Sequence, residues 1–538
     1  MKKTIISFVA LIAAGVMSFT TSSCKDADSV EDLRLTQALS PTSFKMVANA
    51  DLTVTVSWSL MFNAAKYELI ISQDQNFADK SQEAFSQVIS YDYKKDTELS
   101  VTTQKLDPET QYYARLQAIS ADGTVTSSKY VYANVTTIAE QIMNAIAKSN
   151  IQSNSVTVTW TAGEVVKAIE VMTVDGTVEQ TLMPSDAENQ AGQMTITGLT
   201  SHTSYTIRLV SATGKTRGIR SFTTLLDLSG ATIITQAQAA DSSWVAAVEG
   251  AAAGTVFAFE GGNLEYGSAE ALNINSNVVL AAKDITNMPI LHTEFKVNND
   301  ASLYCYYLTL KAEGTVNTFP DQCFDFKSTG ATGSLDVEGC DVSGYAKGLV
   351  YINAATVVNE INITGNLIHD IPCNGGDFID SRKGSWNTLN FTDNTVVSCF
   401  IARDFLRSPK SSVAAGLSNV ENNTFYNCGS GSANYRVFYT QISGAVNNFK
   451  SNVVAGFNNK RGFSNNTSYG TINVSNNVYF DCQNLTELAD GNTEAIVFFD
   501  ENGMVLTASP FRDADNGDFY LEDANMRLKK TGATRWFE

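Results

Sequence analysis

The sequence is poor in several residue types, and each scarcity narrows the possible structures. Its 538 residues include only 8 prolines and 3 histidines, against 35 glycines. No segment after Met17 has the roughly 20 consecutive apolar residues that a membrane-spanning helix needs. Hydrophobic residues make up 43% and charged residues 17% of the chain, which is typical of a globular protein. Abundant glycine and aromatic residues favour strands and turns over helices, and the length suggests about three domains.

Basic residues are also in the minority. Lysine and arginine number 37 against 56 acidic residues, for a net charge of −19. Removal of residues 1–23, which hold two lysines and no acid, would leave 35 − 56 = −21. This acidity argues against nucleic acid and anionic membrane surfaces as partners. It also disfavours long-range attraction of acidic polysaccharides, so such a ligand would need a local basic cluster.

Cysteine is absent between Cys24 and Cys305, and no two cysteines form a C-x-x-C pair, so a zinc site is not expected. An odd number of cysteines remains after Cys24, which in an exported chain leaves at least one unpaired within the molecule. These seven are Cys305, Cys323, Cys340, Cys373, Cys399, Cys428 and Cys482.

The N-terminus has the features of an export signal. Two lysines precede an apolar stretch from Ile5 to Met17, which is too short to span a bilayer, and small polar residues then lead to Cys24. This pattern resembles a bacterial lipoprotein signal, although Thr21 stands where an aliphatic residue is usual. The resemblance implies lipidation at Cys24 and an outer-membrane, surface-exposed location. The alternative is an ordinary secretory peptide with a chance cysteine.

Residues 36–137 show alternating strands and turns. In Thr53–Trp58 the residues Val54, Val56 and Trp58 share one face, which should be buried. Further on, Leu106–Tyr112 reads Leu-Asp-Pro-Glu-Thr-Gln-Tyr. This combination resembles a fibronectin type III domain, in which a tyrosine corner precedes a strand and a tryptophan fills the core.

The same pair of features recurs in residues 138–226, with a strand ending at Trp160 and a corner at Leu199–Tyr205. Ser201 replaces the proline of the first corner, and His202 is interpreted as a turn residue. A second fibronectin type III-like domain is therefore expected. Such domains carry no chemistry by fold alone, so they are interpreted as spacers, with glycan binding through exposed aromatic residues as the alternative.

The C-terminal part contains a repeat marked by asparagine. Its positions are separated by 28, 29, 29 and 25 residues, namely Asn366, Asn394, Asn423, Asn452 and Asn477, and Cys340 takes the place one repeat earlier. A period in the upper twenties predicts a three-strand coil in which equivalent residues stack, whereas a β-propeller would need a period of about 40–45. Asparagine tolerates left-handed backbone, and its amide can bond to the next repeat as a ladder.

The cysteines follow this repeat. Cys399, Cys428 and Cys482 each lie five residues after a ladder asparagine, which predicts an inward stack of small apolar side chains. A disulfide between Cys399 and Cys428 is geometrically possible and remains open.

Both ends of residues 227–538 support a coil. A helix capped by Asp241 or Ser242 precedes the first alternating segment, and a turn is favoured over a calcium loop near Asp513 and Asp518. This part resembles pectate-lyase-like right-handed parallel β-helices. The whole chain resembles Bacteroidetes surface lipoproteins that join fibronectin-like modules to such a domain of unassigned function. Those proteins accompany polysaccharide-degrading gene clusters, which implies a polysaccharide partner.

One pair of repeats is unusually polar. Residues 377–383 align with residues 404–410 at an offset of 27, which should place Asp377 near Asp404, Asp380 near Arg407, and Lys383 near Lys410. Arginine and lysine can hold the carboxylates of uronic acids. The candidate glycan-binding residues are Asp380, Arg382, Lys383, Arg403, Arg407 and Lys410.

Three interpretations of this cluster stay open. It can bind uronic-acid glycans such as pectin without a cofactor. It can be a polysaccharide lyase acting by β-elimination through Arg407, Lys410 and Lys383, in which case calcium would be the cofactor. It can also be a structural or adhesive surface on which Asp380 pairs with Arg407, and Asp404 with Arg403 or Lys383. A polygalacturonase is not expected, because the chain has no Asp-Asp or Gly-His-Gly motif in this part.

Overall fold

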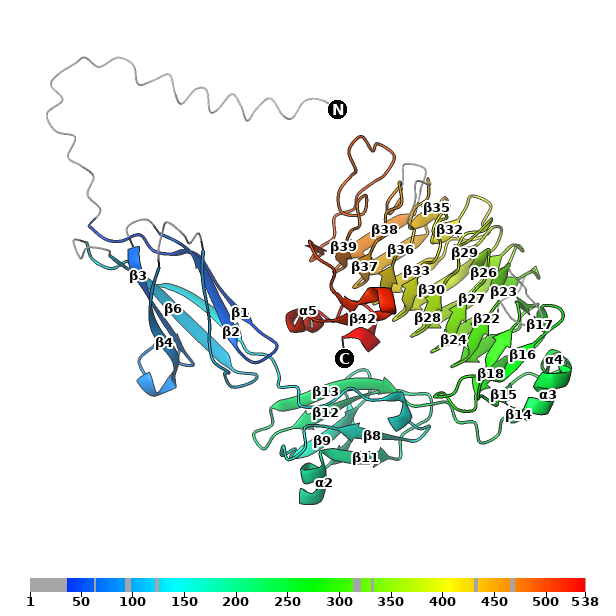
Figure 1. The fold of residues 1–538 in the computed structure, drawn as a ribbon, viewed down its shortest axis with the longest axis horizontal. Coiled ribbons are helices and arrows are strands. Elements are labelled where there is room, and N and C mark those ends of the chain that lie inside the picture. The colour runs from blue at the N-terminus through cyan, green and yellow to red at the C-terminus, as the bar shows by residue number, and fades with distance from the viewer. Residues whose placement is uncertain are drawn as a thin grey trace, which may run out of the picture. The chain divides into compact units, whose positions relative to one another are not determined.

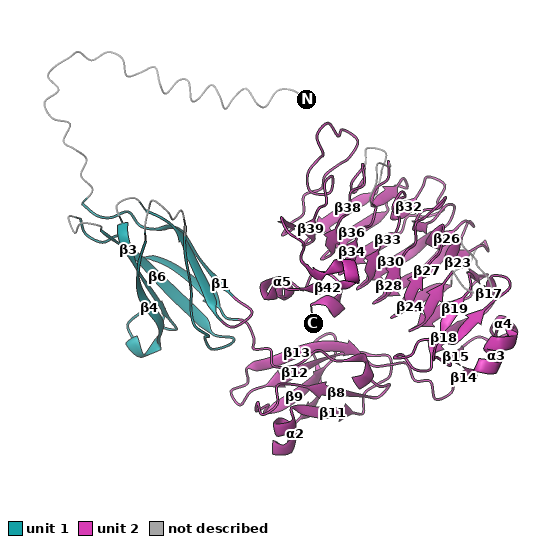
Figure 2. Ribbon diagram, viewed as in Figure 1, with its two compact units in different colours: residues 1–48, 53–137 teal, residues 49–52, 138–538 magenta. Residues whose placement is uncertain are grey.

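The computed structural model describes residues 36–61, 64–91, 98–120, 125–312, 321–329, 333–429, 434–464 and 470–537. The proposed lipidation site, Cys24, lies outside these residues. The chain divides into two compact units, one of residues 1–48 and 53–137 and one of residues 49–52 and 138–538 (Figure 2). Among the described residues, no helix is both long and apolar enough to cross a membrane.

The first unit is a sandwich of two antiparallel sheets. One sheet has the order β1-β2-β5 and the other β4-β3-β6-β7. The strands are β1 (Thr42–Ala48), β2 (Val54–Ser59), β3 (Ala64–Ser72), β4 (Glu83–Ser90), β5 (Glu98–Thr102), β6 (Gln111–Ser120) and β7 (Val131–Thr136), with the short helix η1 (Lys80–Gln82). Val54, Val56 and Trp58 are buried as predicted. The Tyr112 hydroxyl accepts a hydrogen bond from the backbone N–H of Asp107 at 3.2 Å, which confirms the tyrosine corner.

The second sandwich has the same construction. Its sheets have the orders β11-β8 and β10-β9-β12-β13. The strands are β8 (Ser155–Thr159), β9 (Ala168–Met172), β10 (Val178–Leu182), β11 (Gln193–Thr197), β12 (Ser204–Val210) and β13 (Thr216–Thr223), with η2 (Lys148–Asn150) and α2 (Asp186–Ala191). Trp160 is buried, and the Tyr205 hydroxyl accepts a hydrogen bond from the Thr200 N–H at 3.1 Å. His202 lies in the turn with a positive φ of 47°.

The remainder is a parallel β-solenoid with three sheets (Figure 1). The first sheet contains β14 (Thr232–Ile234), β15 (Thr255–Phe259), β18 (Val278–Ala282), β21 (Leu303–Tyr306), β24 (Ser334–Glu338), β27 (Val357–Thr364), β30 (Ser385–Thr392), β33 (Leu417–Glu421), β36 (Val446–Lys450) and β38 (Thr471–Ser475). The second contains β16 (Glu265–Gly267), β19 (Ile290–His292), β22 (Thr309–Lys311), β25 (Asp341–Ser343), β28 (Leu367–His369), β31 (Thr395–Val397), β34 (Thr424–Tyr426), β37 (Val453–Ala455), β39 (Val478–Phe480) and β40 (Met504–Leu506). The third contains β17 (Leu272–Ile274), β20 (Phe295–Val297), β23 (Gln322–Phe326), β26 (Gly348–Ile352), β29 (Ile379–Asp380), β32 (Leu406–Ser408) and β35 (Phe438–Thr440). The expected all-β class, with two sandwiches followed by a parallel β-helix, is confirmed.

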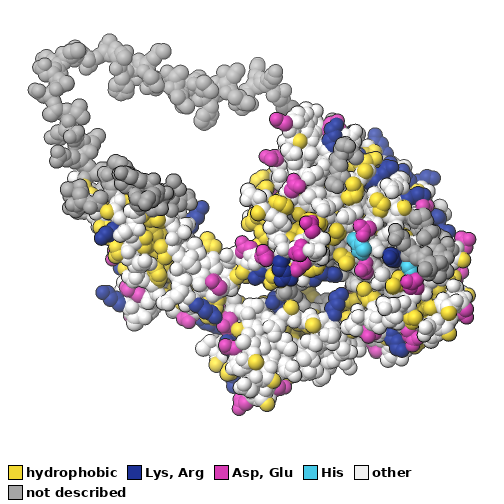
Figure 3. Space-filling view, in the orientation of Figure 1, with side chains coloured by type: hydrophobic (Ala, Val, Ile, Leu, Met, Phe, Trp, Pro, Cys, Tyr) yellow, Lys and Arg dark blue, Asp and Glu magenta, His cyan; other side chains and the backbone are white. Residues whose placement is uncertain are grey.

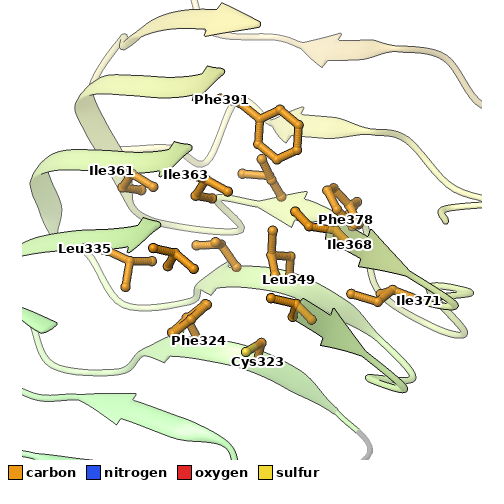
Figure 4. Packing of buried hydrophobic residues seen from close by; sticks show 14 of the residues in the cluster. Cys323, Phe324, Leu335, Leu349, Ile361, Ile363, Ile368, Ile371, Phe378 and Phe391 are labelled. Carbon is orange, nitrogen blue, oxygen red and sulfur yellow. The ribbon is translucent and has the colours of Figure 1, made fainter. Parts of the chain in front are cut away.

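The solenoid encloses a continuous apolar core. Because side chains alternate along each strand, one set points inward, and equivalent inward residues stack from turn to turn. Figure 4 shows Leu335, Ile361 and Phe391 pointing into the same interior as Leu349 and Phe378. This burial supplies the main stabilisation of the coil, and it leaves the alternate residues free to form the outer surfaces.

The predicted asparagine ladder is present at the turn between the first and second sheets. All five ladder asparagines are fully buried, and the Asn366 amide donates to Oδ1 of Asn394 at 2.9 Å. The expectation that these asparagines take up left-handed backbone was wrong. The left-handed residue is the preceding one, such as Asp393 with φ 59°. The ladder residue instead turns its amide inward, where Asn394 also donates to the Ile363 carbonyl at 2.7 Å.

The seven described cysteines are all buried, and none forms a disulfide. The thiols of Cys399, Cys428 and Cys482 donate to backbone carbonyls of the preceding turn, as in the 3.4 Å bond from Cys428 to Val396. The predicted inward stack is therefore confirmed, and Cys399 and Cys428 are not bonded to each other.

Short helices close the first turn of the coil. The predicted helix is α4 (Ser243–Glu249), and a further helix, α3 (Gln236–Asp241), precedes it. Ser242 occupies the N-cap position with left-handed backbone, while the Asp241 carboxylate accepts from the Ser243 N–H at 2.9 Å. The Trp244 ring is buried, and its Nε1 donates to the Gly267 carbonyl.

The C-terminal segment packs on the outer side of the second sheet. It consists of β41 (Phe511–Asp513), η3 (Ala514–Asn516), β42 (Asp518–Leu521), α5 (Ala524–Leu528) and η4 (Thr534–Trp536). Phe511 and Phe519 bury their rings against Val453, Ala455 and Val478 of the coil. The segment between Asp513 and Asp518 forms the one-turn helix η3, which ends at Gly517 with left-handed backbone. The outer side of the third sheet, by contrast, carries the predicted polar residues.

Candidate functional site

The outer side of the third sheet carries a row of polar and aromatic side chains, which we call the polar face. Parallel strand pairing sets its members side by side, one from each successive strand. They are Lys296, Asp325, Tyr351, Asp380, Arg407 and Tyr439. Because strands are spaced about 4.8 Å apart, the six residues span roughly 24 Å along the coil.

Two of the three predicted neighbour pairs are confirmed. Asp380 is paired in register with Arg407 across β29 and β32. The N–H of Asp404 donates to Oδ1 of Asp377 at 3.2 Å, so these acidic residues also stack. The third pair, Lys383 with Lys410, lies beyond the strand register, and both side chains are exposed. The Ser411 hydroxyl, which donates to the Arg382 carbonyl at 2.7 Å, holds the two turns together.

The ion pairs differ in part from those expected. Asp380 pairs most closely with Arg382, at 2.5 Å, and its contact with Arg407 is 4.0 Å. Arg407 also contacts Asp377 at 3.2 Å. The expected pairing of Asp404 with Arg403 or Lys383 was wrong.

The partner of Asp404 is Arg436, whose Nε lies 2.9 Å from Oδ1 of the carboxylate. Arg436 stands one turn later in the coil, at the position stacked on Asp404, whereas Arg403 is the adjacent residue along the chain. The Arg403 guanidinium instead lies over the Tyr435 ring, 5.3 Å from its centre. Arg436 was missed in the sequence because its segment lacks the aspartates that defined the alignment of the two polar repeats.

An acid–base pair occurs twice on the polar face. Asp325 pairs with Lys327 at 2.7 Å, just as Asp380 pairs with Arg382, and the strand bearing Tyr351 lies between them. Both pairs have the form Asp-x-basic, and the two aspartates are 55 residues apart, about twice the repeat length. Sequence reasoning missed Asp325, but this doubled spacing is the signal that could have identified it.

Burial raises the pKa of several acidic side chains at the polar face. Asp380 is 1% exposed, and its burial, reinforced by the neighbouring Asp377, raises the pKa of its carboxyl. Burial raises the pKa of Asp404 to about 6. Burial, with Asp325 close by, raises the pKa of Glu294 to about 7. Some of these groups therefore carry less than a full negative charge near neutral pH.

The surroundings of the polar face are consequently basic. The basic residues are Lys296, Lys327, Lys347, Arg382, Lys383, Arg403, Arg407, Lys410 and Arg436, and the acidic residues are Glu294, Asp321, Asp325, Asp377, Asp380 and Asp404. With every group ionised, the nine basic and six acidic residues sum to +3, in a chain whose net charge is −19. Figure 3 shows lysine and arginine gathered along the upper right of the molecule, where Figure 1 draws β32 and β35.

Several polar atoms on this face are buried without a hydrogen-bond partner among the described residues. They include Oδ1 of Asp325, Oδ1 of Asp380 and Nε of Arg407. The Arg407 guanidinium also lies 5.1 Å from the centre of the Tyr439 ring, which fixes its plane. The exposed part of a planar guanidinium held in this way can receive a carboxylate. In the part of the chain that the structure describes, no three His, Cys, Asp or Glu side chains are grouped to hold a metal ion.

Family models match three parts of the chain. Residues 140–224 match the fibronectin type III domain, residues 264–399 match a domain of unknown function, DUF4957, and residues 418–536 match another, DUF5123. Lys296 and Asp380 fall within the DUF4957 match, Tyr439 falls within the DUF5123 match, and Arg407 lies between the two. No curated protein matches the chain.

Solved structures similar to the chain include fibronectin type III segments. A two-domain segment from chicken tenascin is 18% identical, covers 34% of this chain and 97% of its own, and has a TM-score of 0.23. The central fibronectin-III array of RIM-binding protein is 14% identical, covers 36% and 62%, and has a TM-score of 0.14. Scores this low carry no argument about function. The fibronectin type III match and the strand topology make the chain an all-β protein in which fibronectin type III sandwiches precede a parallel β-solenoid.

Proposed function

We propose that the polar face binds polysaccharides that contain uronic acids, such as pectin-like chains, and that the protein is a surface lipoprotein of a glycan-utilisation system. The observation that carries the proposal is that the polar face and its neighbouring charges form a locally basic strip on the outside of a strongly acidic protein. Uronic-acid polymers repeat a carboxylate along an extended chain, and the strip repeats cationic groups along the coil. The pectate-lyase-like resemblance of the solenoid supports the same class of ligand.

The residues suit this ligand individually. Arg382 and Arg407 offer planar donors that match a carboxylate. Tyr351 is half-buried, so its ring can pack against the apolar face of a sugar while its hydroxyl stays polar. The Tyr439 ring instead holds the guanidinium groups of Arg407 and Arg436, which lie 5.1 Å and 4.3 Å from its centre. Lys383 and Lys410 are exposed beside them and add positive charge that steers an anionic chain toward the strip.

The arrangement favours binding over β-elimination. A lyase needs a base beside the uronate and a cation on its carboxylate. Arginine stays protonated in proteins, so Arg407 suits the second role and not the first. Lys383 or Lys410 would have to act as the base, and calcium could assist. Lyase activity is therefore the second candidate, and it rests on the proximity of these lysine-bearing turns to Arg407.

The lipid anchor at Cys24 and the resemblance to Bacteroidetes surface lipoproteins belong to the same proposal. An anchored protein with two sandwich domains would hold the solenoid away from the membrane, where it can meet long polymers. Replacement of Cys24 by serine should release the protein from the outer-membrane fraction of its cell. Retention of the Cys24→Ser protein in that fraction would remove the anchor from the proposal.

Affinity electrophoresis in gels containing polygalacturonate, fully methyl-esterified pectin or a neutral glucan tests the binding itself. Polygalacturonate should retard the protein, and the two uncharged polymers should do so much less. Arg407→Ala and Lys410→Ala should each reduce the retardation. Lys450→Ala, which removes the same charge from the first sheet, should not.

No retardation by polygalacturonate, or equal retardation of all variants, would overturn the proposal. Absorbance of unsaturated products, followed with and without calcium on the same polymer, separates a lyase from a binding protein.

A further inference from the structure

A groove lies on the outer side of the second sheet, away from the residues of the polar face and beside the C-terminal segment. It is a groove of about 580 Å³ between the outer side of the second sheet and the turn that carries η3. Its lining includes His369, Val397, Tyr426, Asn427, Asp515 and Trp536. The volume falls within the range of sites for small ligands, roughly 300–1,000 Å³.

Aromatic rings form one wall of this groove and are fixed in place. The Phe519 ring lies 5.3 Å from that of Tyr426 and 5.4 Å from that of Trp536. Trp536 donates from Nε1 to the Thr395 hydroxyl at 2.7 Å. The Tyr426 hydroxyl donates to Asp515 at 2.7 Å. The wall is therefore held before any ligand arrives, which lowers the entropic cost of binding.

Polar groups occupy the rim. Asp370, Asn427 and Asp515 are exposed. Ser398 lies in the turn between those of Asp370 and Asn427. Carboxylate and amide groups together can accept from and donate to several hydroxyls. Aromatic walls with convergent polar groups at the rim are suited to a ring that has an apolar face and hydroxyl edges.

The charges of the lining cancel, unlike those of the polar face. His369 is bonded to Asp370 at 2.7 Å and to Asp341 at 3.1 Å. The hydrogen bond with Asp341 is the largest influence that raises the pKa of His369 to about 9, so the ring is cationic at neutral pH. The lining thus holds two positive groups, His369 and Arg535, and two negative groups, Asp370 and Asp515, and Asp341 adds a third negative group behind His369, so the groove has no excess of positive charge. A ligand without net charge suits it best.

We propose that this groove binds a neutral sugar, at the size of one or two pyranose rings. The sugar ring would pack on the partly exposed Tyr426 and Trp536 rings, which the buried Phe519 ring supports, and its hydroxyls would bond to Asp515, Asn427 and Asp370. The protein then has two glycan sites of different chemistry, a basic strip for charged polymer and a neutral groove for an uncharged sugar unit. This inference does not depend on the strip binding anything.

Saturation-transfer NMR and calorimetry on the protein test the groove with methyl glycosides of glucose, galactose, mannose, xylose, arabinose and rhamnose. Methyl galacturonoside serves as the charged comparison. At least one neutral glycoside should bind, and the galacturonoside should bind more weakly. Asp515→Ala should weaken the neutral ligand at least about tenfold, because a hydrogen bond to a charged group is lost.

Two further variants complete the test. Asp518→Ala removes a carboxylate from the same turn. This carboxylate pairs with Arg512 and does not line the groove, so its loss should leave the affinity unchanged. Val397→Trp fills the floor and should abolish binding while circular dichroism stays that of the folded protein. The proposal is overturned if none of the neutral glycosides binds, or if binding survives both Asp515→Ala and Val397→Trp. Loss of polygalacturonate binding in Arg407→Ala bears only on the strip, so the two proposals fail separately.

Discussion

Arg407 and Asp380 face each other in register across two strands, yet their nearest charged atoms are 4.0 Å apart and neither atom makes a hydrogen bond among the described residues. Asp380 turns its other oxygen to Arg382, and Arg407 turns an amino group to Asp377. The pair is therefore not closed on itself. Both atoms are buried, so a ligand would contact the exposed parts of the Arg382 and Arg407 guanidinium groups, whose side chains are 35% and 24% exposed.

Substitution of Asp380 by asparagine should strengthen binding of polygalacturonate. It removes one negative charge beside Arg382 and Arg407, and about 1 kcal/mol is the lower limit, set by water, for the effect of a unit charge about 4 Å away. An increase in affinity of about fivefold is expected, together with a steeper loss of affinity as salt is added. Calorimetry at two salt concentrations measures both effects.

Asp377→Asn is the matched comparison, because it neutralises the other acidic partner of Arg407. It should also raise the affinity. If Asp380→Asn instead abolishes binding while Asp377→Asn does not, Asp380 contacts the ligand directly and the electrostatic account is wrong.

The fold could be predicted further from the sequence than the site. The asparagine period identified the stacked coil, since a residue that bonds to its own copy must recur once per turn. It also placed Asp380 beside Arg407. The ion pairs were harder to predict, because each charged side chain in a coil has possible partners both along its own strand and in the adjacent turns. Asp380 pairs with Arg382, and Asp404 pairs with Arg436, and residue spacing alone does not predict either pair.

The buried asparagine ladder should contribute more to stability than a second asparagine ladder on the outer side of the first sheet, which Asn362, Asn390 and Asn419 form. Asn394→Ala removes a fully buried amide that accepts from Asn366 and leaves that donor without a partner. The expected loss is about 2–4 kcal/mol in the free energy of unfolding of the solenoid. Urea unfolding followed by circular dichroism measures it.

Asn390→Ala provides the control. Asn390 belongs to an outer ladder on the first sheet, where it bonds to Asn362 and Asn419 at 2.9 Å but is only half-buried. Water can replace these bonds, so a loss below about 1 kcal/mol is expected. Equal losses for the two substitutions would contradict the assignment of the inner ladder as the stabilising one.

The outer ladder was not predicted, although its members recur with the same period. Asn362, Asn390 and Asn419 are each next to an inward residue on their strands and read as ordinary solvent-facing residues. The groove beside the C-terminal segment could not be predicted from the sequence either. Asp515 and Tyr426 are 89 residues apart, and only the return of the chain over the second sheet brings them together.

The cysteines of the solenoid should be unreactive in the folded protein. All seven are buried, and burial raises the pKa of Cys428 to about 12, so the nucleophilic thiolate is scarce. A protein carrying Cys24→Ser should show no rapid reaction with a thiol reagent, and seven reactive thiols after denaturation without reductant. A count of five in denaturant would indicate a disulfide and contradict the stack of free thiols.

His369 should make the stability of the solenoid dependent on pH. Its pKa in the folded protein is about 9, against about 6.5 in an unfolded chain, so folding favours the protonated form. The stabilisation is complete below about pH 6.5 and is lost as the pH rises through about 9. The ring is partly exposed, so its loss should lower the melting temperature by only about 1–3 °C.

The comparison is with His369→Asn, which keeps a donor toward Asp341 but cannot titrate. Other groups contribute to the pH profile of both proteins, so the difference between the two melting curves isolates His369. That difference should be largest in acid and should shrink toward pH 9. A constant difference across this range would show that the Asp341–His369–Asp370 contacts do not depend on the imidazolium charge, and would also remove the cation that balances the neutral groove.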